Sequence, residues 1–323
     1  MIPNLWYPIY QSSRLKPDRP VGIKRLGAQI VLWRARDGGV VAMPDRCPHR
    51  SAMLSRGKIH DGCLECPYHG LLFDTGGKCV RIPANGARAA VLGGFDIAPE
   101  IIREEHGLIW QWYGAGTPTS EVPWMSEMPE EQGAVQSYSY EADVPYLRVV
   151  ENLLDFHHFY FVHRRTLFGS GPRVENYDAH IENDTVVMTG ELAHERPGWL
   201  RPKIPFRALC KLPAATHIEI FDTSVNYLLT PVDDDRTWIW GRYGGKSAGY
   251  LGRMMNWFAA RYDRAVFQFQ DRAVLRSQVD IPGDFSRFRL YEADRAIALF
   301  FGMRKRALLE ASNAHPVSAA AGR

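Results

Sequence analysis

Short apolar segments separated by turn residues fill the first 115 positions of the chain. Four runs have the length and composition of strands: Ala28–Arg34, Val40–Met43, Leu71–Phe73 and Leu108–Tyr113. Turn-forming stretches break up the runs, among them Asp37-Gly38-Gly39 and Asp74-Thr75-Gly76-Gly77. This pattern predicts a small all-β domain over residues 1–115.

The pattern changes after a segment rich in Pro, Gly, Ser and Glu, Gly114–Glu131, which predicts a linker over residues 116–135. A helix is expected around Leu147–Val162. Three long strand-like runs follow, with Pro231–Asp235 as a hairpin connection between the last two: Thr185–Leu192, Thr216–Leu229 and Arg236–Tyr243.

Apolar residues then recur at intervals of three and four from Tyr250 to Gln278, which predicts a long amphipathic helix. Strands and helices together predict an α+β second domain over residues 136–311. Residues 312–323 are small and without periodicity, so we expect a flexible tail there.

Length, charge and cysteine number argue against several classes of protein. A chain of 323 residues favours two domains, and its net charge of +3, without a clustered basic run, gives no reason to expect nucleic acid or an anionic membrane as a partner. No apolar stretch reaches the roughly 18 residues that a membrane span needs. Five cysteines, an odd number, do not suggest a secreted disulfide framework. We therefore expect a cytoplasmic protein.

The first candidate chemistry lies in two short segments, Cys47-Pro48-His49 and Cys66-Pro67-Tyr68-His69-Gly70. Such closely spaced donors must come from loop tips, because alternate residues of a strand point to opposite faces. Two thiolates and two imidazoles can hold a [2Fe–2S] cluster or a structural zinc ion. The remaining cysteines, Cys63, Cys79 and Cys210, are expected to be buried packing residues.

The second candidate lies in the segment from Asn152 to His163. Asn152, Asp155 and His158 are spaced by three and would share one face of a helix, whereas His163 needs a helix end or a π-bulge to join them. Two histidines and one carboxylate form the facial triad of non-haem Fe(II) sites. An isolated histidine is more often structural, and it is the grouping that favours a metal site.

Both segments resemble known signatures. CPHR followed by CPYHG resembles the Rieske cluster motif, and the later segment resembles the NxxDxxHxxxxH motif of Rieske non-haem iron oxygenases. The resemblance implies that Cys47, His49, Cys66 and His69 hold the cluster, and that His158 and His163 hold a mononuclear iron, with His157 as a neighbour. The third iron ligand would be Asp271, in a stretch similar to the family's; Asp280 and Asp284 are lesser candidates. The alternative for Asp271 is an exposed acid paired with arginine.

The resemblance covers nearly the whole chain and implies a Rieske domain followed by a helix-grip catalytic domain. It implies that Asp155 links a cluster histidine, His69 of one subunit, to the iron-bound His158 of the next in a head-to-tail homotrimer. Asn152 would lie close to the iron without binding it. Arg46, Arg50, Arg56 and Lys58 flank the cluster loops, either as a solvated rim or as a docking patch for an acidic electron donor.

The brevity of the chain resembles the compact monooxygenase and demethylase members. Such a terminal oxygenase uses O2 and two electrons to hydroxylate or demethylate a small, largely apolar organic molecule. No GxGxxG fingerprint follows a strand, so a separate NAD(P)H-dependent reductase or ferredoxin is expected as the electron donor. A ring cis-dihydroxylase and a simple electron-transfer protein are the alternatives.

Overall fold

The computed structural model describes residues 1–86, 89–91, 93–127, 135–163, 171–195, 202–220, 223–245, 249–278 and 288–314. The chain forms two compact units. One consists of Trp6–Val122 with Pro231–Asp233, and the other of Met1–Leu5, Pro123–Thr230 and Asp234–Arg323. The division at Val122 falls inside the predicted linker.

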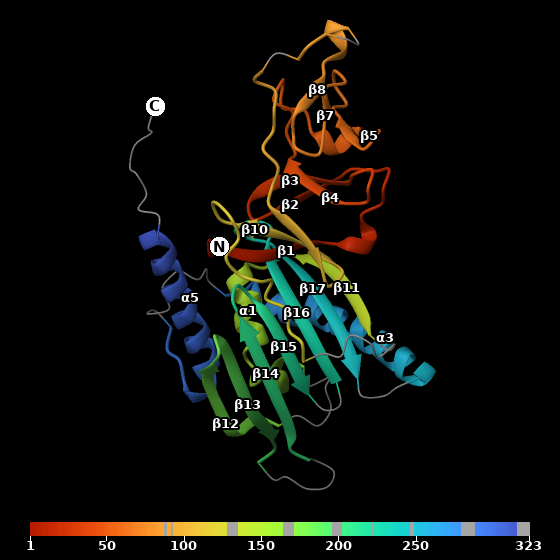
Figure 1. The fold of residues 1–323 in the computed structure, drawn as a ribbon. Coiled ribbons are helices and arrows are strands. Elements are labelled where there is room, and N and C mark those ends of the chain that lie inside the picture. The colour runs from red at the N-terminus through yellow and green to blue at the C-terminus, as the bar shows by residue number, and fades with distance from the viewer. Residues whose placement is uncertain are drawn as a thin grey trace. The chain divides into compact units, whose positions relative to one another are not determined.

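The N-terminal unit is built from small antiparallel sheets, as predicted (Figure 1). One sheet has the order β2–β3–β4 (Val21–Arg25, Ala28–Arg34, Val40–Pro44). A second has the order β5–β6–β7–β8 (Lys58–His60, Cys63–Glu65, Leu72–Phe73, Cys79–Arg81). The third has the order β1–β10–β9 (Leu5–Gln11, Leu108–Tyr113, Ile102–Glu105).

Tight packing joins the first two sheets around the cysteines. Trp33, Met43 and Phe73 are fully buried in one cluster with Cys47 and Cys66. Gly57, which precedes β5, lies so close to β6 that a Cβ atom there would stand 1.9 Å from the carbonyl oxygen of Glu65. This part of the fold therefore excludes any side chain at residue 57.

The second unit is a seven-stranded antiparallel sheet with helices against it. Its order is β11–β17–β16–β15–β14–β13–β12 (Gln136–Ala142, Thr237–Gly245, Thr223–Pro231, Ala215–Ile220, Ile204–Lys211, Thr185–Ala193, Arg173–Glu182). The hairpin predicted at Pro231–Asp235 joins β16 to its neighbour β17. The helices are α1 (Tyr146–Leu153), α2 (His158–Val162), α3 (Gly249–Val266), α4 (Arg272–Leu275) and α5 (Arg295–Ala314).

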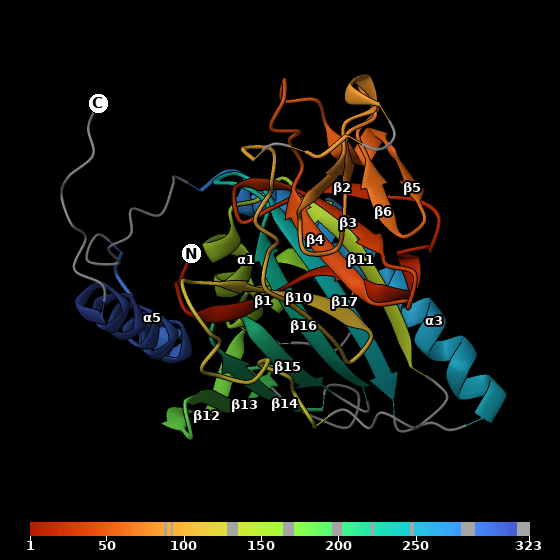
Figure 2. The same ribbon diagram turned by 45° about the horizontal axis from the view of Figure 1, so that its top comes forward.

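The core of this unit lies between the sheet and the helices. Val150 and Leu153 of α1 and Phe300 of α5 share one buried cluster with Val186 and Ile239 of the sheet. Within the unit, α3 runs beside β17 and β11, and α5 lies toward β12 and β13 at the other end of the sheet (Figure 2). The α+β fold class is as predicted.

Two predictions of continuous elements are wrong. The helix expected over Leu147–Val162 is two helices, α1 and α2, because the Asp155 carboxylate accepts backbone N–H groups and interrupts the helix. The strand expected over Thr216–Leu229 is the antiparallel pair β15 and β16, with Ile220 opposite Thr223. Asp222, a turn-forming residue within that run, lies outside the described residues.

The helix expected over Tyr250–Gln278 is present with an irregularity. α3 is followed by a π-helical turn, Phe267–Asp271, and then by α4. At the C-terminus α5 extends to Ala314, three residues into the expected tail, and residues 315–323 lie outside the described part. Among the described helices, none combines the length and apolar character required to cross a bilayer.

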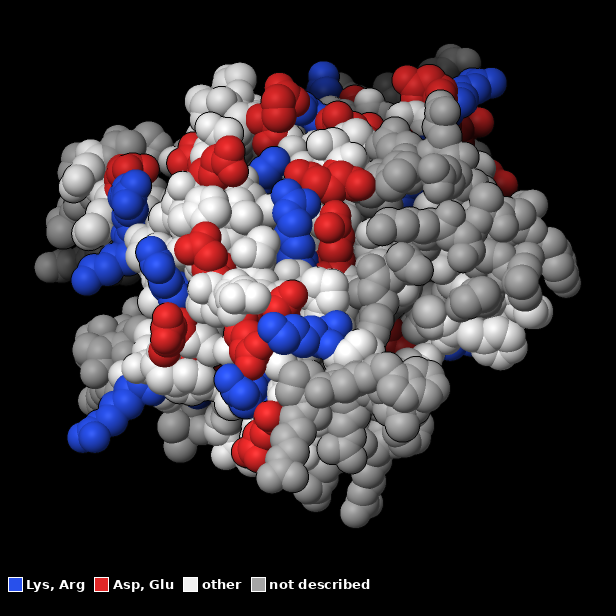
Figure 3. Space-filling view, turned by 90° about the horizontal axis from the view of Figure 1, so that it is seen from below, with Lys and Arg blue, Asp and Glu red and all other residues white. Residues whose placement is uncertain are grey.

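The surface of the second unit carries both charges. On the face in Figure 3, lysine and arginine alternate with aspartate and glutamate. The second unit also contains ion pairs, for example that of Lys203 with Glu175 at 2.8 Å and with Glu191 at 3.2 Å. Among the described residues of this face, no broad area of one sign gathers, in keeping with the small net charge.

We expect Gly57→Ala to destabilise the N-terminal unit by about 2 kcal/mol, because the added methyl group must push β5 away from β6. Urea unfolding measures the change. Gly93→Ala is the matched control, since nothing lies within 4 Å of a Cβ atom at that position. Equal stability of the two variants would contradict the close approach.

Candidate metal centres

Two loops of the N-terminal unit present the first set of donors. The first follows β4 and is closed by the N–H of Cys47, which donates to the carbonyl oxygen of Ala52 at 2.9 Å. The second joins β6 to β7, and there the N–H of Cys66 donates to Leu71 at 2.8 Å. Gly70 adopts φ +71°, which allows its N–H to turn back to the carbonyl oxygen of Cys66 at 3.1 Å. Each loop thus carries a thiol at its base.

The four side chains form two pairs. The thiols of Cys47 and Cys66 are neighbours and almost fully buried, with 2% and 1% exposure. The imidazoles of His49 and His69 are exposed, and their Nδ1 atoms lie 3.2 Å apart. A [2Fe–2S] cluster held by two thiolates at one iron and two imidazoles at the other requires this separation into pairs.

The same geometry disfavours zinc. A tetrahedral zinc ion draws four ligands around one point. All four residues are described, and no three of their donor atoms lie within 4.8 Å of one another. The donors therefore fit two metal ions better than one.

The environment of Cys47 favours the protonated thiol, so a metal ion must displace that proton in order to bind. Burial raises the pKa of its thiol to about 11, while backbone hydrogen bonds from His49 and Arg50 act in the opposite direction. The thiol is protonated at neutral pH unless a metal replaces its proton. N–H groups directed at a ligand sulfur also tune the potential of a cluster.

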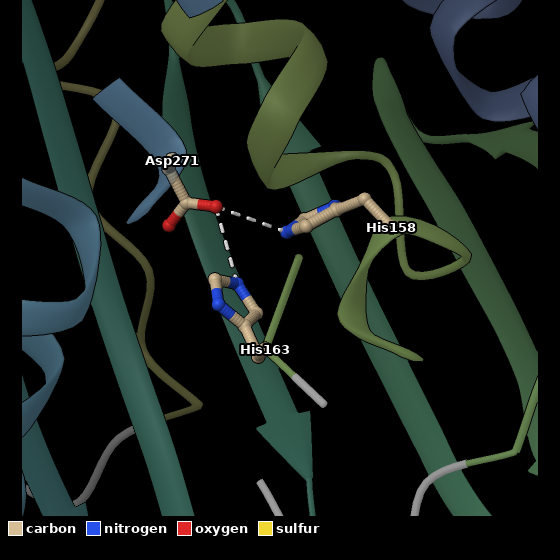
Figure 4. A group of neighbouring side chains, drawn as sticks. All are labelled: His158, His163 and Asp271. Carbon is tan, nitrogen blue, oxygen red and sulfur yellow. Dashed lines mark ion pairs between the residues drawn. The ribbon is translucent and has the colours of Figure 1, made fainter. Parts of the chain in front are cut away.

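The second set of donors comes together in the other unit. His158, His163 and Asp271 offer donor atoms that all lie within 4.8 Å of one another. Oδ1 of Asp271 lies 3.1 Å from Nε2 of His163 and 3.5 Å from Nε2 of His158. Figure 4 shows the two rings directed at the Asp271 carboxylate, which comes from a separate segment of the chain.

Irregular backbone produces this convergence. His158 begins α2, and His163 lies just beyond its last residue, Val162, so the helix end brings His163 into position. Asp271 closes the π-helical turn, Phe267–Asp271, that follows α3. Single π turns are frequent at functional sites because one extra residue redirects a side chain.

Neighbouring side chains orient the donors. Nδ1 of His163 lies 2.7 Å from Oε1 of Gln270; because that oxygen can only accept, Nδ1 carries the proton and Nε2 is left free to bind a metal. Asn152 lies beside the group, with its Nδ2 3.4 Å from Nε2 of His158 and 3.5 Å from Oδ1 of Asp271. Burial lowers the pKa of His163, but the adjacent Asp271 carboxylate outweighs it and leaves the pKa raised.

Asp155 lies on the other side of the His158 ring. Its Oδ1 accepts the backbone N–H of His157 at 2.8 Å and approaches that of His158 at 3.3 Å, and its Oδ2 lies 3.5 Å from Nδ1 of His158. Burial raises the pKa of this carboxyl, but the His158 ring and the two N–H groups lower it more, so the net pKa is depressed. The ring of His158 is thus placed between two carboxylates, Asp155 and Asp271.

His157 points elsewhere. Its Nδ1 lies 2.9 Å from the Tyr291 hydroxyl and its Nε2 lies 2.8 Å from the carbonyl oxygen of Pro172. Both ring nitrogens are engaged, which separates His157 from the donors. Asp280 and Asp284, the lesser candidates, lie outside the described residues.

A cavity of about 200 Å³ opens beside the three donors. Its walls are mainly apolar and come from β15, β16, β17, α2, α3 and the π-helical turn; they include Phe159, Ile218, Val225 and Phe267. A cavity of this kind next to a metal site suits a small organic molecule.

One polar group in the cavity wall was not expected from the sequence. The carboxylate of Asp263 accepts hydrogen bonds from the hydroxyls of Tyr138, Tyr227 (2.6 Å) and Tyr243. Burial raises the pKa of Asp263 and the hydroxyls lower it, with a net rise. The four residues come from β11, β16, β17 and α3, so no local pattern signals the cluster.

Family models match both units. A Rieske [2Fe–2S] domain matches residues 5–97, and a vanillate O-demethylase oxygenase C-terminal domain matches residues 142–298. Among curated proteins, methylxanthine N1-demethylase NdmA of Pseudomonas putida is 30% identical over 290 residues, 83% of this chain and 80% of that protein. The oxygenase component of dicamba O-demethylase of Stenotrophomonas maltophilia is 32% identical over 234 residues, 71% of this chain and 62% of that protein.

A plant relative is longer. Protein TIC 55 of Pisum sativum, a chloroplast protein, is 30% identical over 290 residues, 85% of this chain but only 52% of that protein. The chain therefore spans about half the length of this relative.

Solved structures share the fold. Dicamba monooxygenase bound to 3,6-dichlorosalicylic acid superposes with a TM-score of 0.77 at 22% identity, covering 97% of this chain and 99% of that one. NdmA of Pseudomonas putida CBB5 gives 0.73 at 23% identity, covering 95% and 94%. Both units match family models, and most of the length of the relative NdmA is covered. The chain therefore belongs to the Rieske non-haem iron oxygenase family.

Proposed function

We propose that this chain is the terminal oxygenase of a multicomponent system that hydroxylates or oxidatively demethylates a small, largely apolar organic molecule. The observation that carries the proposal is the convergence of His158, His163 and Asp271 beside an apolar cavity, in a chain that also has a Rieske domain. The demethylase relatives agree with this reaction class.

In this proposal Cys47, His49, Cys66 and His69 hold the cluster, and His158, His163 and Asp271 hold the mononuclear iron. Two imidazoles and one carboxylate leave coordination positions open on Fe(II). When bound, the iron supplies the activation of O2 and the cluster supplies electrons one at a time. The two groups of donor residues fit a [2Fe–2S] cluster and a mononuclear iron in the number, type and grouping of their donor atoms.

The protein's own residues position and enclose the reaction. Gln270 fixes the tautomer of His163, and Asn152 fills the space beside His158 without the basicity of a strong ligand. The apolar wall, including Phe159 and Val225, keeps bulk water away from the donors and holds the substrate next to them.

Asp155 is proposed as the electron route between subunits of a head-to-tail homotrimer. Its carboxylate faces Nδ1 of His158. Asp155 also lines a hollow of about 390 Å³, together with Arg148 and Asp294. His69 is exposed on its own unit, so the imidazole of a neighbouring subunit can enter such a hollow and donate to Asp155. A carboxylate between two metal-bound imidazoles fixes both rings.

The electron donor is proposed to be a separate NAD(P)H-dependent reductase or ferredoxin. Arg46, Arg50, Arg56 and Lys58 are all exposed around the cluster loops, which supports docking of an acidic partner there. We place the protein in the cytoplasm because none of its five cysteines forms a disulfide, in keeping with a reducing compartment. The chloroplast relative shows that location varies among similar proteins.

His158→Ala and Asp271→Ala should each lose the mononuclear iron and all turnover while the visible absorption of the cluster stays unchanged, because the two donor sets are independent. Iron analysis and product formation measure the effect. His157→Ala is the matched control and should retain the iron, since both of its ring nitrogens have other partners. Full iron content in the Asp271 variant would remove that residue from the site.

Asp155→Asn should keep both metals and slow reoxidation of the reduced cluster by O2 about 100-fold, the scale of losing a carboxylate partner of a ligand histidine. An asparagine oxygen can still accept the N–H of His157, so the break between α1 and α2 is retained. Stopped-flow absorption of the cluster follows the reaction. Reoxidation at the wild-type rate would contradict the bridging role.

A further inference from the structure

The cavity beside the iron ligands carries a second carboxylate with no part in holding the metal. Asp263 lies on α3, eight residues before Asp271, or roughly 12 Å of helix rise. Its side chain lines the cavity together with Tyr227 and Tyr243. The cavity thus has a metal-binding end and a second polar end at Asp263, with apolar walls between.

The polar end is rich in acceptors. The hydroxyls of Tyr138, Tyr227 and Tyr243 all donate to Asp263, so their protons are used within the cluster. The groups that these lining residues can still offer a ligand are carboxylate and phenol oxygens, which can accept a hydrogen bond. A carboxylate can accept about four hydrogen bonds, and the tyrosines supply three.

The described lining of the cavity also lacks lysine and arginine. Its acidic residues and histidines are Asp263, Asp271, His158 and His163. At the Asp263 end, away from the proposed iron, the carboxylate or sulfonate group of an organic anion would lose its hydration, meet no lysine or arginine among the described lining residues, and face the Asp263 carboxylate. Such a ligand is disfavoured both by the loss of its hydration and by repulsion from the Asp263 carboxylate.

The packing around the cluster shows that it is held in place. Gly241 on β17 lies against the ring of Tyr138, and a Cβ atom there would stand 2.5 Å from Cζ of that ring. The tyrosines come from the three neighbouring strands β11, β17 and β16. Asp263 therefore meets a fixed set of donors, and a ligand meets a pre-formed acceptor site.

We propose that Asp263 determines substrate class: the cavity selects a neutral or cationic molecule whose N–H or O–H group donates to Asp263, and it rejects organic anions. The donor group binds at Asp263 while the carbon to be oxidised lies at His158, His163 and Asp271. This inference rests on the proposed oxygenase function, because it uses the same cavity as the substrate site.

Three probes with one skeleton test the proposal: 4-methoxybenzylamine, 4-methoxybenzyl alcohol and 4-methoxybenzoate. They differ at one end only, as cation, neutral donor and anion. Anaerobic calorimetric titration of the holoenzyme should show the amine and the alcohol binding at least about tenfold more tightly than the benzoate. Equal affinities, a preference for the benzoate, or no binding of the amine and the alcohol would overturn the proposal.

Asp263→Asn removes the charge and keeps an oxygen that can accept from the tyrosines. We expect the preference for the amine over the benzoate to fall to within about threefold in this variant. Asp178→Asn is the matched control, because it removes an exposed carboxylate on β12 and should leave the preference unchanged. An unchanged preference in Asp263→Asn would also overturn the proposal, and if that variant does not fold, the wild-type comparison decides alone.

Formaldehyde release separates this inference from the proposed function. Fully reduced holoenzyme is mixed with O2 and the bound amine or alcohol in a single turnover, which needs no reductase. Selective binding without any oxidised product would contradict the oxygenase function and leave the selectivity intact. Product formation from the benzoate at the rate of the amine would contradict the selectivity alone.

Discussion

The hydrogen bonds between the Asp155 carboxylate and the backbone N–H groups of His157 and His158 determine the arrangement of the second metal centre. They end the helical run after α1 and allow α2 to begin at His158. Because α2 is only five residues long, His163 emerges at its end and returns toward Asp271.

The same carboxylate also lies on the proposed route of electron transfer. One of its oxygens holds the backbone while the other faces the His158 ring, so the residue that shapes the site also lies on the proposed path into it. The N-terminal unit is organised for the same purpose. Its thiols are buried in the apolar core, and its imidazoles His49 and His69 are exposed where a partner can reach them. In the proposed cluster, burial would shield the iron held by the thiols, and exposure would shorten the distance from a partner to the iron held by the imidazoles.

Local patterns in the sequence predicted much of this organisation. The strands Ala28–Arg34 and Leu108–Tyr113 were predicted with their observed bounds, since apolar runs between turns are a local signal. The paired cysteine and histidine motifs pointed to the cluster loops. The break at Asp155 was not predicted. The spacing of three residues from Asn152 to Asp155 to His158 fits a continuous helix, and it fits equally well a carboxylate that accepts backbone N–H groups and interrupts the helix. The tyrosine cluster around Asp263 was missed because it depends on the pairing of β11, β17 and β16.

The proposed function requires two separate iron sites in one chain. Anomalous X-ray diffraction from crystals of the iron-loaded protein, with data on both sides of the iron absorption edge, can locate both. We expect one density feature between Cys47, Cys66, His49 and His69, and another bounded by Nε2 of His158, Nε2 of His163 and the Asp271 carboxylate. Iron at the first position alone, or a metal at the second that shows the zinc edge and no iron edge, would contradict the proposed function.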